Sequence, residues 1–170
     1  MRFFTLIVAM LVLSGCAARY DQVNLSVPDI KFSKDGSVII ATPANGYYET
    51  TEYRSSGRMT ALAVKSAFSK HSRNTKIAKD CKDLACLREK YPNEFRYYVV
   101  PEILHWEERA TEWSGIPDRI EVQVSIYEQG TWKDISSTQI TGKSKWATFG
   151  GDHPQDLLPK PLNSYVDSLY

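Results

Sequence analysis

The sequence predicts an α+β domain in which one mixed β-sheet carries helices mainly on one face, after a cleaved signal peptide. Two observations support this fold class. The first part of the chain alternates short apolar runs with amphipathic stretches, which is typical of strand–helix–strand units. The later part holds three strand-like segments in succession, separated by turn residues, as in an antiparallel meander. The expected element order is therefore β-α-β-α-β-β-β-α.

Residues 1–15 have the layout of a secretory signal peptide. Arg2 supplies a positive charge, the run from Phe3 to Leu13 is apolar, and two small residues follow. This apolar run is too short for a transmembrane helix, which needs about 20 residues. The segment Leu13-Ser14-Gly15-Cys16 resembles the lipobox of bacterial lipoproteins. That resemblance implies cleavage before Cys16 and a covalent lipid on its sulfur, so we expect a permanent membrane anchor.

The remaining chain is predicted to be a tethered single domain. Residues 16–36 contain turn-forming residues without sustained apolar periodicity, so we expect the lipidated cysteine and a flexible tether there. Residues 37–170 are long enough for one domain with its own core. Without Arg2 the basic residues equal the acidic ones, of which the chain has 20. This neutrality argues against nucleic acid as a partner, because phosphate binding needs concentrated positive charge.

The first half of the domain is predicted to alternate strands and helices. Residues 37–42 form an apolar run that ends at Pro43, which predicts a buried strand. Residues 44–54 are polar and contain tyrosines, as in a loop. Ser55 or Ser56 can then cap a helix. The apolar side of this helix consists of Ala61, Leu62, Val64, Ala67 and Phe68. A brief strand over residues 75–78 follows.

Cys81 and Cys86 are predicted to form a disulfide, because the compartment beyond the membrane is oxidising. In an unbroken helix their Cα atoms would be about 8.6 Å apart, too far for a bridge. Cys81 should therefore precede the helix and Cys86 should lie in an early turn. Free thiols, or redox or metal chemistry, remain alternatives. The helix begins at Asp80 or Asp83 and ends before Pro92, and it carries Leu84, Leu87 and Tyr91.

The second half of the domain is predicted to be a meander with a final helix. A long strand begins near residue 95 and runs toward residue 113, and residues 115–118 form a turn. Apolar and polar residues alternate over 119–128, which predicts a half-buried strand. A third strand covers residues 132–146, and 147–159 form an irregular loop. Pro161 suits the first position of a helix whose apolar stripe is Leu162, Tyr165, Val166, Leu169 and Tyr170.

Several catalytic motifs are absent from the sequence. It contains no G-x-S-x-G nucleophile elbow, no S-x-x-K pair and no H-E-x-x-H zinc motif. His105 and Glu107 share one strand face, which is typical of ordinary surface residues. Asp152 and His153 lie in a glycine-containing loop, where they either form a turn or belong to a site. We therefore expect no enzymatic activity, no catalytic residue, no metal and no cofactor apart from the lipid on Cys16.

Aromatic and charged residues gather near the ends of two predicted strands. Tryptophan and arginine are favoured at protein interfaces, where they bury a large area. The alternative is that the tryptophans belong to the core or cover sheet edges. The candidate interaction residues are Trp106, Arg109, Trp113, Trp146, Phe149, Asp152 and His153.

Two segments resemble a family of uncharacterised bacterial lipoproteins, the domain of unknown function 4823 family. The first segment is 101–115, with the sequence PEILHWEERATEWSG, and the second is 143–154, with the sequence KSKWATFGGDHP. Together with the lipobox, the resemblance covers most of the chain. It implies a shared domain and an envelope location, but it implies no activity.

These observations predict an envelope lipoprotein with a non-enzymatic domain that acts in protein interaction or assembly. Its partners would be the membrane, through the anchor, and an envelope protein or further copies of itself. The alternative is a binding module for a glycan or small envelope ligand, with Trp113 or Trp146 as an aromatic platform. Ala17 follows the lipidated cysteine, where aspartate commonly marks inner-membrane retention in enteric lipoproteins. We therefore expect an outer-membrane location facing the periplasm.

Overall fold

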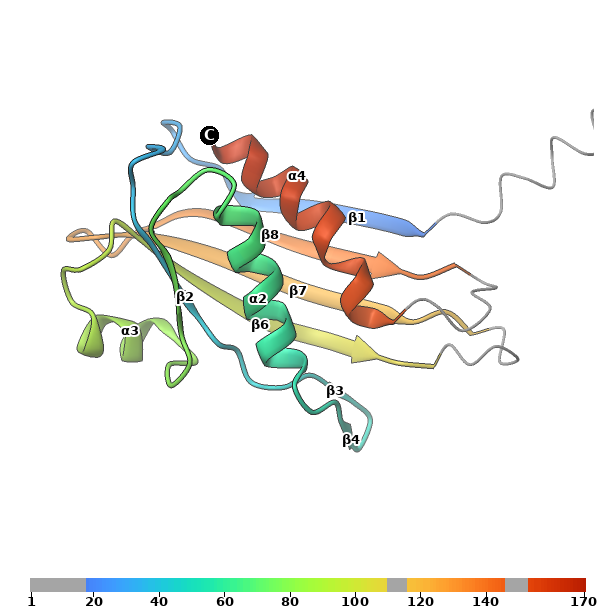
Figure 1. Cartoon of the computed structure of the whole chain (residues 1–170). Coiled ribbons are helices and arrows are strands. Elements are labelled where there is room, and N and C mark those ends of the chain that lie inside the picture. Colours follow the sequence, from blue (N-terminus) through green and yellow to red (C-terminus); the bar gives the residue numbers. More distant parts are fainter. Residues whose placement is uncertain (1–17, 110–115, 146–152) are drawn as a thin grey trace, which may run out of the picture.

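A six-stranded mixed sheet forms the centre of the protein, with the strand order β1-β8-β7-β6-β2-β5 (Figure 1). The computed structural model describes residues 18–109, 116–145 and 153–170. The strands are β1 (Arg19–Ser26), β2 (Val38–Ala41), β5 (Thr75–Ala78), β6 (Tyr97–Glu107), β7 (Arg119–Glu128) and β8 (Asp134–Lys143). Two further short strands, β3 (Tyr47–Tyr48) and β4 (Thr51–Glu52), pair with each other. The predicted α+β class is confirmed.

The helices are α2 (Ser56–Phe68), α3 (Leu84–Lys90) and α4 (Pro159–Leu169), with a short 3-10 helix, η2 (Pro154–Leu157), before α4. Strand β2 pairs in parallel with both β5 and β6, whereas β6, β7, β8 and β1 pair antiparallel. This arrangement matches the predicted strand–helix–strand start followed by a meander. No helix within the described residues combines the length and the apolar composition needed to cross a membrane.

Helices α2 and α4 lie on one face of the sheet and enclose the main core (Figure 1). The alternation predicted for β7 is confirmed, because every second residue from Ile120 to Ile126 is fully buried beneath them. Full burial of such a side chain contributes about 1.5–3 kcal/mol. The helices contribute Ala61, Val64, Ala67, Phe68, Leu162, Tyr165, Val166 and Leu169 to this core.

Helix α3 covers the opposite face at the β2–β5 side of the sheet. Ile39 and Ile40 are neighbours on β2 and therefore point to opposite faces, and both are fully buried. Ile39 joins Leu87 of α3 and Tyr98 in a second, smaller core. Over β7 and β8 the same face is polar, and the hydroxyls of Ser125 and Ser137 lie 3.1 Å apart.

The flexible tether predicted for residues 16–36 is wrong for most of its length. Arg19–Ser26 forms strand β1, which pairs with β8 along the edge of the sheet. Phe32 is also buried and stacks on Tyr97 with ring centroids 4.3 Å apart. The prediction failed because an edge strand packs little apolar surface, so its apolar periodicity is weak.

Two helix starts also differ from the predictions. Ser55 precedes α2 but makes no side-chain cap, and Ser56 Oγ instead accepts a hydrogen bond from the Gly46 amide at 2.8 Å. Asn45 Oδ1 accepts a hydrogen bond from the Gly57 amide at 3.2 Å, so the loop before α2 provides an acceptor for a backbone N–H group in the first turn of the helix. Helix α4 begins at Pro159, two residues before the predicted start at Pro161.

Candidate interaction surface

Among the strands that the structure describes, β1 pairs only with β8, so it is an edge strand. Val23 and Leu25 on β1 are 52% and 53% exposed. The chain continues through Val27 and Ile30, which are 68% and 81% exposed. We call these four side chains the apolar strip. Single exposed apolar residues are normal on a protein surface, but several of them close together in one segment are typical of an interaction site.

The apolar strip belongs to a segment that is fixed at several points. Ser26 Oγ donates a hydrogen bond to Asp134 Oδ1 at 2.8 Å. The Phe32 amide donates to the Leu169 carbonyl at 2.8 Å, which ties the segment to the end of α4. The exposure of the strip is therefore a property of the folded domain.

Polar side chains of β1 form local hydrogen bonds, one of them with a backbone amide. The Gln22 amide donates to Asp21 Oδ1 at 3.0 Å, and the Gln22 side chain donates to Asn24 Oδ1 at 2.9 Å. Charged and polar side chains of this kind protect an edge strand from pairing with another strand. The side chains of the apolar strip, more than the β1 backbone, are thus available for contact.

Two hollows flank the segment that carries Val27 and Pro28. One has a volume of about 290 Å³ and includes Ser136 and Tyr165 in its lining. Burial raises the pKa of Tyr165, and its hydroxyl lies 2.7 Å from Ser136 Oγ. The other hollow, of about 330 Å³, is bordered by Lys31, Arg96, Lys133, Asp29, Glu128 and Asp134. Its mixed charges indicate no single class of ligand.

A buried carboxylate lies near the end of β6. The Glu107 side chain is 6% exposed, and its Oε1 lies 2.8 Å from Arg109 Nε. Its Oε2 lies 3.0 Å from His105 Nε2, so the two residues meet on one strand face, but the burial of Glu107 contradicts the prediction that they are ordinary surface residues. The Arg109 guanidinium also lies over the Tyr48 ring, 4.4 Å from its centroid. This cluster ties β3 to β6, and we interpret it as structural because both carboxylate oxygens are already paired.

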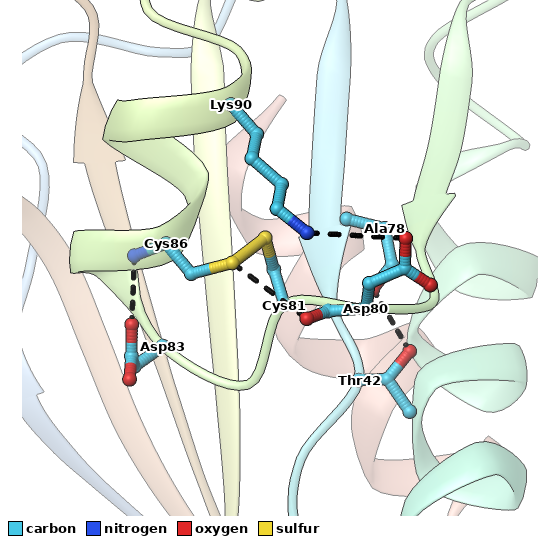
Figure 2. The surroundings of a disulfide bond; sticks show 7 residues. All are labelled: Thr42, Ala78, Asp80, Cys81, Asp83, Cys86 and Lys90. Carbon is cyan, nitrogen blue, oxygen red and sulfur yellow. Dashed lines mark hydrogen bonds and ion pairs between the residues drawn. A yellow bond between two sulfur atoms is a disulfide. The ribbon is translucent and has the colours of Figure 1, made fainter.

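The predicted disulfide between Cys81 and Cys86 is present, with a Cα–Cα distance of 5.3 Å (Figure 2). As predicted, Cys81 precedes α3 and Cys86 lies in its first turn. Asp83 caps the helix, because its Oδ1 accepts from the Cys86 amide at 2.8 Å. Figure 2 also shows Lys90 of α3 near Asp80, with Nζ and Oδ2 3.9 Å apart.

The predicted interaction residues do not form one surface within the described residues. Trp106 is 1% exposed and belongs to the main core, which contradicts its predicted interface role and favours the alternative. Arg109 is engaged by Glu107. His153 Nδ1 lies 2.9 Å from Glu108 Oε1, and its amide donates to Asp156 at the start of η2. The other candidates, Trp113, Trp146, Phe149 and Asp152, lie outside the described residues, as does Cys16.

The apolar strip was not predicted from the sequence. The signal that identifies part of it is the alternation of Val23, Leu25 and Val27 with polar residues, which is typical of a strand. That alternation is short and interrupted by Pro28, so it resembles a tether. Within the described residues, no group of three or more histidine, cysteine or acidic side chains is arranged to hold a metal ion.

The family model of the domain of unknown function DUF4823 matches residues 30–169. The chain belongs to the DUF4823 family. The resemblance predicted from the two sequence segments is thus confirmed. No curated protein matches the chain.

Solved structures with a similar fold come from other bacteria. A PelC dodecamer from Paraburkholderia phytofirmans has a TM-score of 0.63 and 12% identity, over 89% of this chain and 96% of that chain. A second PelC dodecamer structure from the same organism has a TM-score of 0.57 and 16% identity, over 89% and 91%. Protein XCC0632 from Xanthomonas campestris, of the DUF330 family, has a TM-score of 0.50 and 12% identity, over 88% and 93%. At these identities the similarity shows the fold alone.

Proposed function

We propose that this protein is a lipoprotein of the bacterial cell envelope whose domain acts without catalysis, by association with further copies of itself. A lipid on Cys16 would hold it in the outer membrane, with the domain in the periplasm. The observation that carries the proposal is the apolar strip on edge strand β1 and the segment after it.

The apolar strip favours a protein partner over solvent exposure. All four side chains are more than half exposed, although the segment is anchored to β8 and α4. Covering a Val, Leu or Ile side chain completely contributes about 1.5–3 kcal/mol. A contact that covers the strip on two copies would therefore offset a substantial part of the entropy cost of association.

A second copy is the favoured partner for two reasons. Two of the solved structures with this fold are described as dodecamers, which is a property of those proteins and supports the same mode of action here. A lipid anchor would also confine all copies to one plane, which raises their effective concentration.

The sequence and the disulfide favour the envelope. The lipobox resemblance supports lipidation at Cys16, and a small-loop disulfide is typical of proteins in an oxidising compartment. Ala17, after the cysteine, supports the outer membrane as the destination.

Sedimentation velocity of the detergent-solubilised, full-length protein tests the proposal. We expect the wild type to sediment as an oligomer, and Leu25→Lys, which places a charge in the strip, to shift it toward the monomer. Leu62→Lys is the matched control, because Leu62 is similarly exposed at 49% but lies on α2. A monomeric wild type, or equal effects of both substitutions, would refute self-association through the strip.

The alternative, a binding module for a glycan or small envelope ligand, stays a prediction. The tryptophans proposed as its platform, Trp113 and Trp146, lie outside the described residues.

A further inference from the structure

We propose that the end of the sheet at which β1 begins lies on the bilayer that holds the anchor, and that it binds anionic lipid headgroups there. This inference rests on the proposed lipid on Cys16. At this end, on the right in Figure 1, β6 and β8 end while β1 and β7 begin.

Three cations form a row across this end of the sheet. Arg19 on β1 lies directly opposite Lys143 on β8, and Lys143 lies directly opposite Arg119 on β7. All three are exposed. Within the described residues, none of them takes part in an ion pair. We call these three residues the basic row. Like charges directly opposite one another destabilise a sheet, so the basic row indicates an anionic partner.

Among the residues that the structure describes, the carboxylates near the basic row do not form ion pairs with it, so they do not take the place of an anionic partner. Glu107 lies opposite Arg119 but is bound by Arg109 and His105. Asp21 and Glu121 both lie opposite Thr141, two residues farther from the end than the basic row. Carboxylates also lie at the level of the basic row, where Glu107 is held by Arg109 and His105, and Glu108 follows it with its Oε1 2.9 Å from His153 Nδ1. Within the described residues, the basic row therefore keeps exposed cations that could contact an anionic surface placed across the end of the sheet.

The position of the predicted anchor places that end at the membrane. Arg19 is the third residue after Cys16, and an extended chain spans about 10 Å over three residue steps. Two more cations lie nearby. Lys145 follows β8 by two residues, and Lys160 in the first turn of α4 contacts the Tyr20 ring of β1, with 5.1 Å to its centroid. A bilayer with phosphatidylglycerol would supply the complementary charge at the level of the basic row.

This orientation has a consequence for assembly. The strands would stand on the membrane, so that edge strand β1 and the apolar strip face sideways along the bilayer. Copies in the same leaflet would then present their strips at the same height. The membrane contact and the proposed self-association thus use different surfaces of the domain.

Depth-dependent quenching of a fluorophore by nitroxide lipids tests the orientation. The full-length protein is reconstituted in phosphatidylcholine vesicles with phosphatidylglycerol. A single cysteine is introduced as Lys145→Cys near the basic row, or as Thr131→Cys in the turn at the opposite end. Each is the one free thiol, because Cys81 and Cys86 are bridged and Cys16 would be acylated. The ten residues of β7 separate the two ends by about 30 Å. We expect several-fold stronger quenching at position 145 than at position 131.

A charge variant tests the chemistry of the contact. Neutralising the basic row with Arg19→Gln, Lys143→Gln and Arg119→Gln should lower the affinity of this end for the anionic surface by about a hundredfold. Quenching at position 145 should fall to its level in vesicles of phosphatidylcholine alone. The matched control, Lys70→Gln, Lys79→Gln and Lys82→Gln, removes three exposed cations elsewhere and should leave quenching unchanged. High salt should reproduce the loss in the wild type, even if the charge variant fails to fold.

The mass of the intact protein shows whether Cys16 is lipidated, and so distinguishes a failure of the membrane contact from a failure of the proposed anchor. If acyl chains are present on Cys16 but both positions are quenched equally, or neutralising the basic row or adding salt changes nothing, the membrane contact is refuted and the anchor stands. If no acyl chain is present, the proposed anchor itself is refuted, and this inference with it.

Discussion

At the scale of single residues, Glu107 is the buried carboxylate on which the end of β6 depends. It is 4% exposed overall, and Arg109 and His105 occupy its two oxygens. A buried carboxylate that loses its cation keeps its desolvation cost, so its partners contribute more than surface ion pairs do. The exposed cation Arg119 provides a contrast, because it has no carboxylate partner within the described residues.

We therefore expect Arg109→Gln to lower the free energy of unfolding by about 2 kcal/mol. Arg119→Gln should change it by less than about 0.5 kcal/mol, or stabilise the sheet by relieving repulsion from Lys143. Denaturant unfolding of both variants measures the difference. Equal effects would contradict the structural role assigned to the Glu107 cluster.

Tyr170 and Tyr165 predict how stability depends on alkaline pH. Burial raises the pKa of Tyr170 from 10.0 to about 12, and the pKa of Tyr165 still further. The unfolded chain releases these protons near pH 10, whereas the folded chain keeps them. The stabilisation is therefore complete below pH 10 and is lost as the pH rises from 10 toward 12. For one tyrosine the loss is at most about 1.4 kcal/mol per pH unit.

Tyr170→Phe isolates this effect, because the Tyr170 hydroxyl is buried and has no hydrogen-bond partner among the described residues. We expect the substitution to leave stability at pH 7 unchanged or slightly higher and to weaken the alkaline loss. Tyr165→Phe should also weaken that loss, but it should cost about 1 kcal/mol at pH 7, because the hydrogen bond with Ser136 disappears. Urea unfolding at pH 7 and near pH 11 checks both. An unchanged pH slope in both variants would contradict the assignment.

At the scale of elements, the disulfide fixes helix α3 against the smaller core. Cys81 is fully buried beside Leu87, and the helix has seven residues, too few to be stable alone. Six residues lie within the closed loop, and in the chain-entropy model a loop of this size contributes about 2 kcal/mol.

We expect Cys81→Ala with Cys86→Ala to lower the free energy of unfolding by about 2 kcal/mol and to increase amide exchange mainly in α3. Reducing the wild type should reproduce the effect, and the reductant should not change the double variant. Exchange that rises equally in α3 and α4 would indicate that the disulfide supports the whole domain instead.

The elements also show what could be predicted from the sequence. Strand β7 was predictable because its apolar residues alternate beneath two helices, and α3 because Asp83 and the cysteine spacing fix its start. Strand β1 was missed because most of its side chains are exposed, so its sequence lacks the pattern of buried apolar residues that identifies a strand. The apolar strip was missed for the same reason. The N-terminal cap of α2 was misassigned because the acceptor for the Gly57 amide is the side chain of Asn45, which lies eleven residues before Ser56 in the sequence.

At the scale of the whole molecule, the domain has different surfaces for different contacts. Helices α2 and α4 cover one face of the sheet, and α3 covers part of the other (Figure 1). The apolar strip lies along one edge, and the basic row lies at one end. The same fold occurs in PelC and in a DUF330 protein at no more than 16% identity, so the fold tolerates very different sequences. We therefore base the proposed assembly on this chain's own apolar strip.

Native mass spectrometry of the protein extracted from membranes tests the central claim most directly, because one spectrum reports both the acyl chains and the number of copies. We predict a multiple of the mass of the chain from Cys16 onward, increased by the mass of its lipid. Leu25→Lys should reduce the assembly to lipidated single chains, while Leu62→Lys should leave it intact. A wild-type spectrum of single chains without lipid would contradict the proposal of a membrane-anchored, self-associating domain.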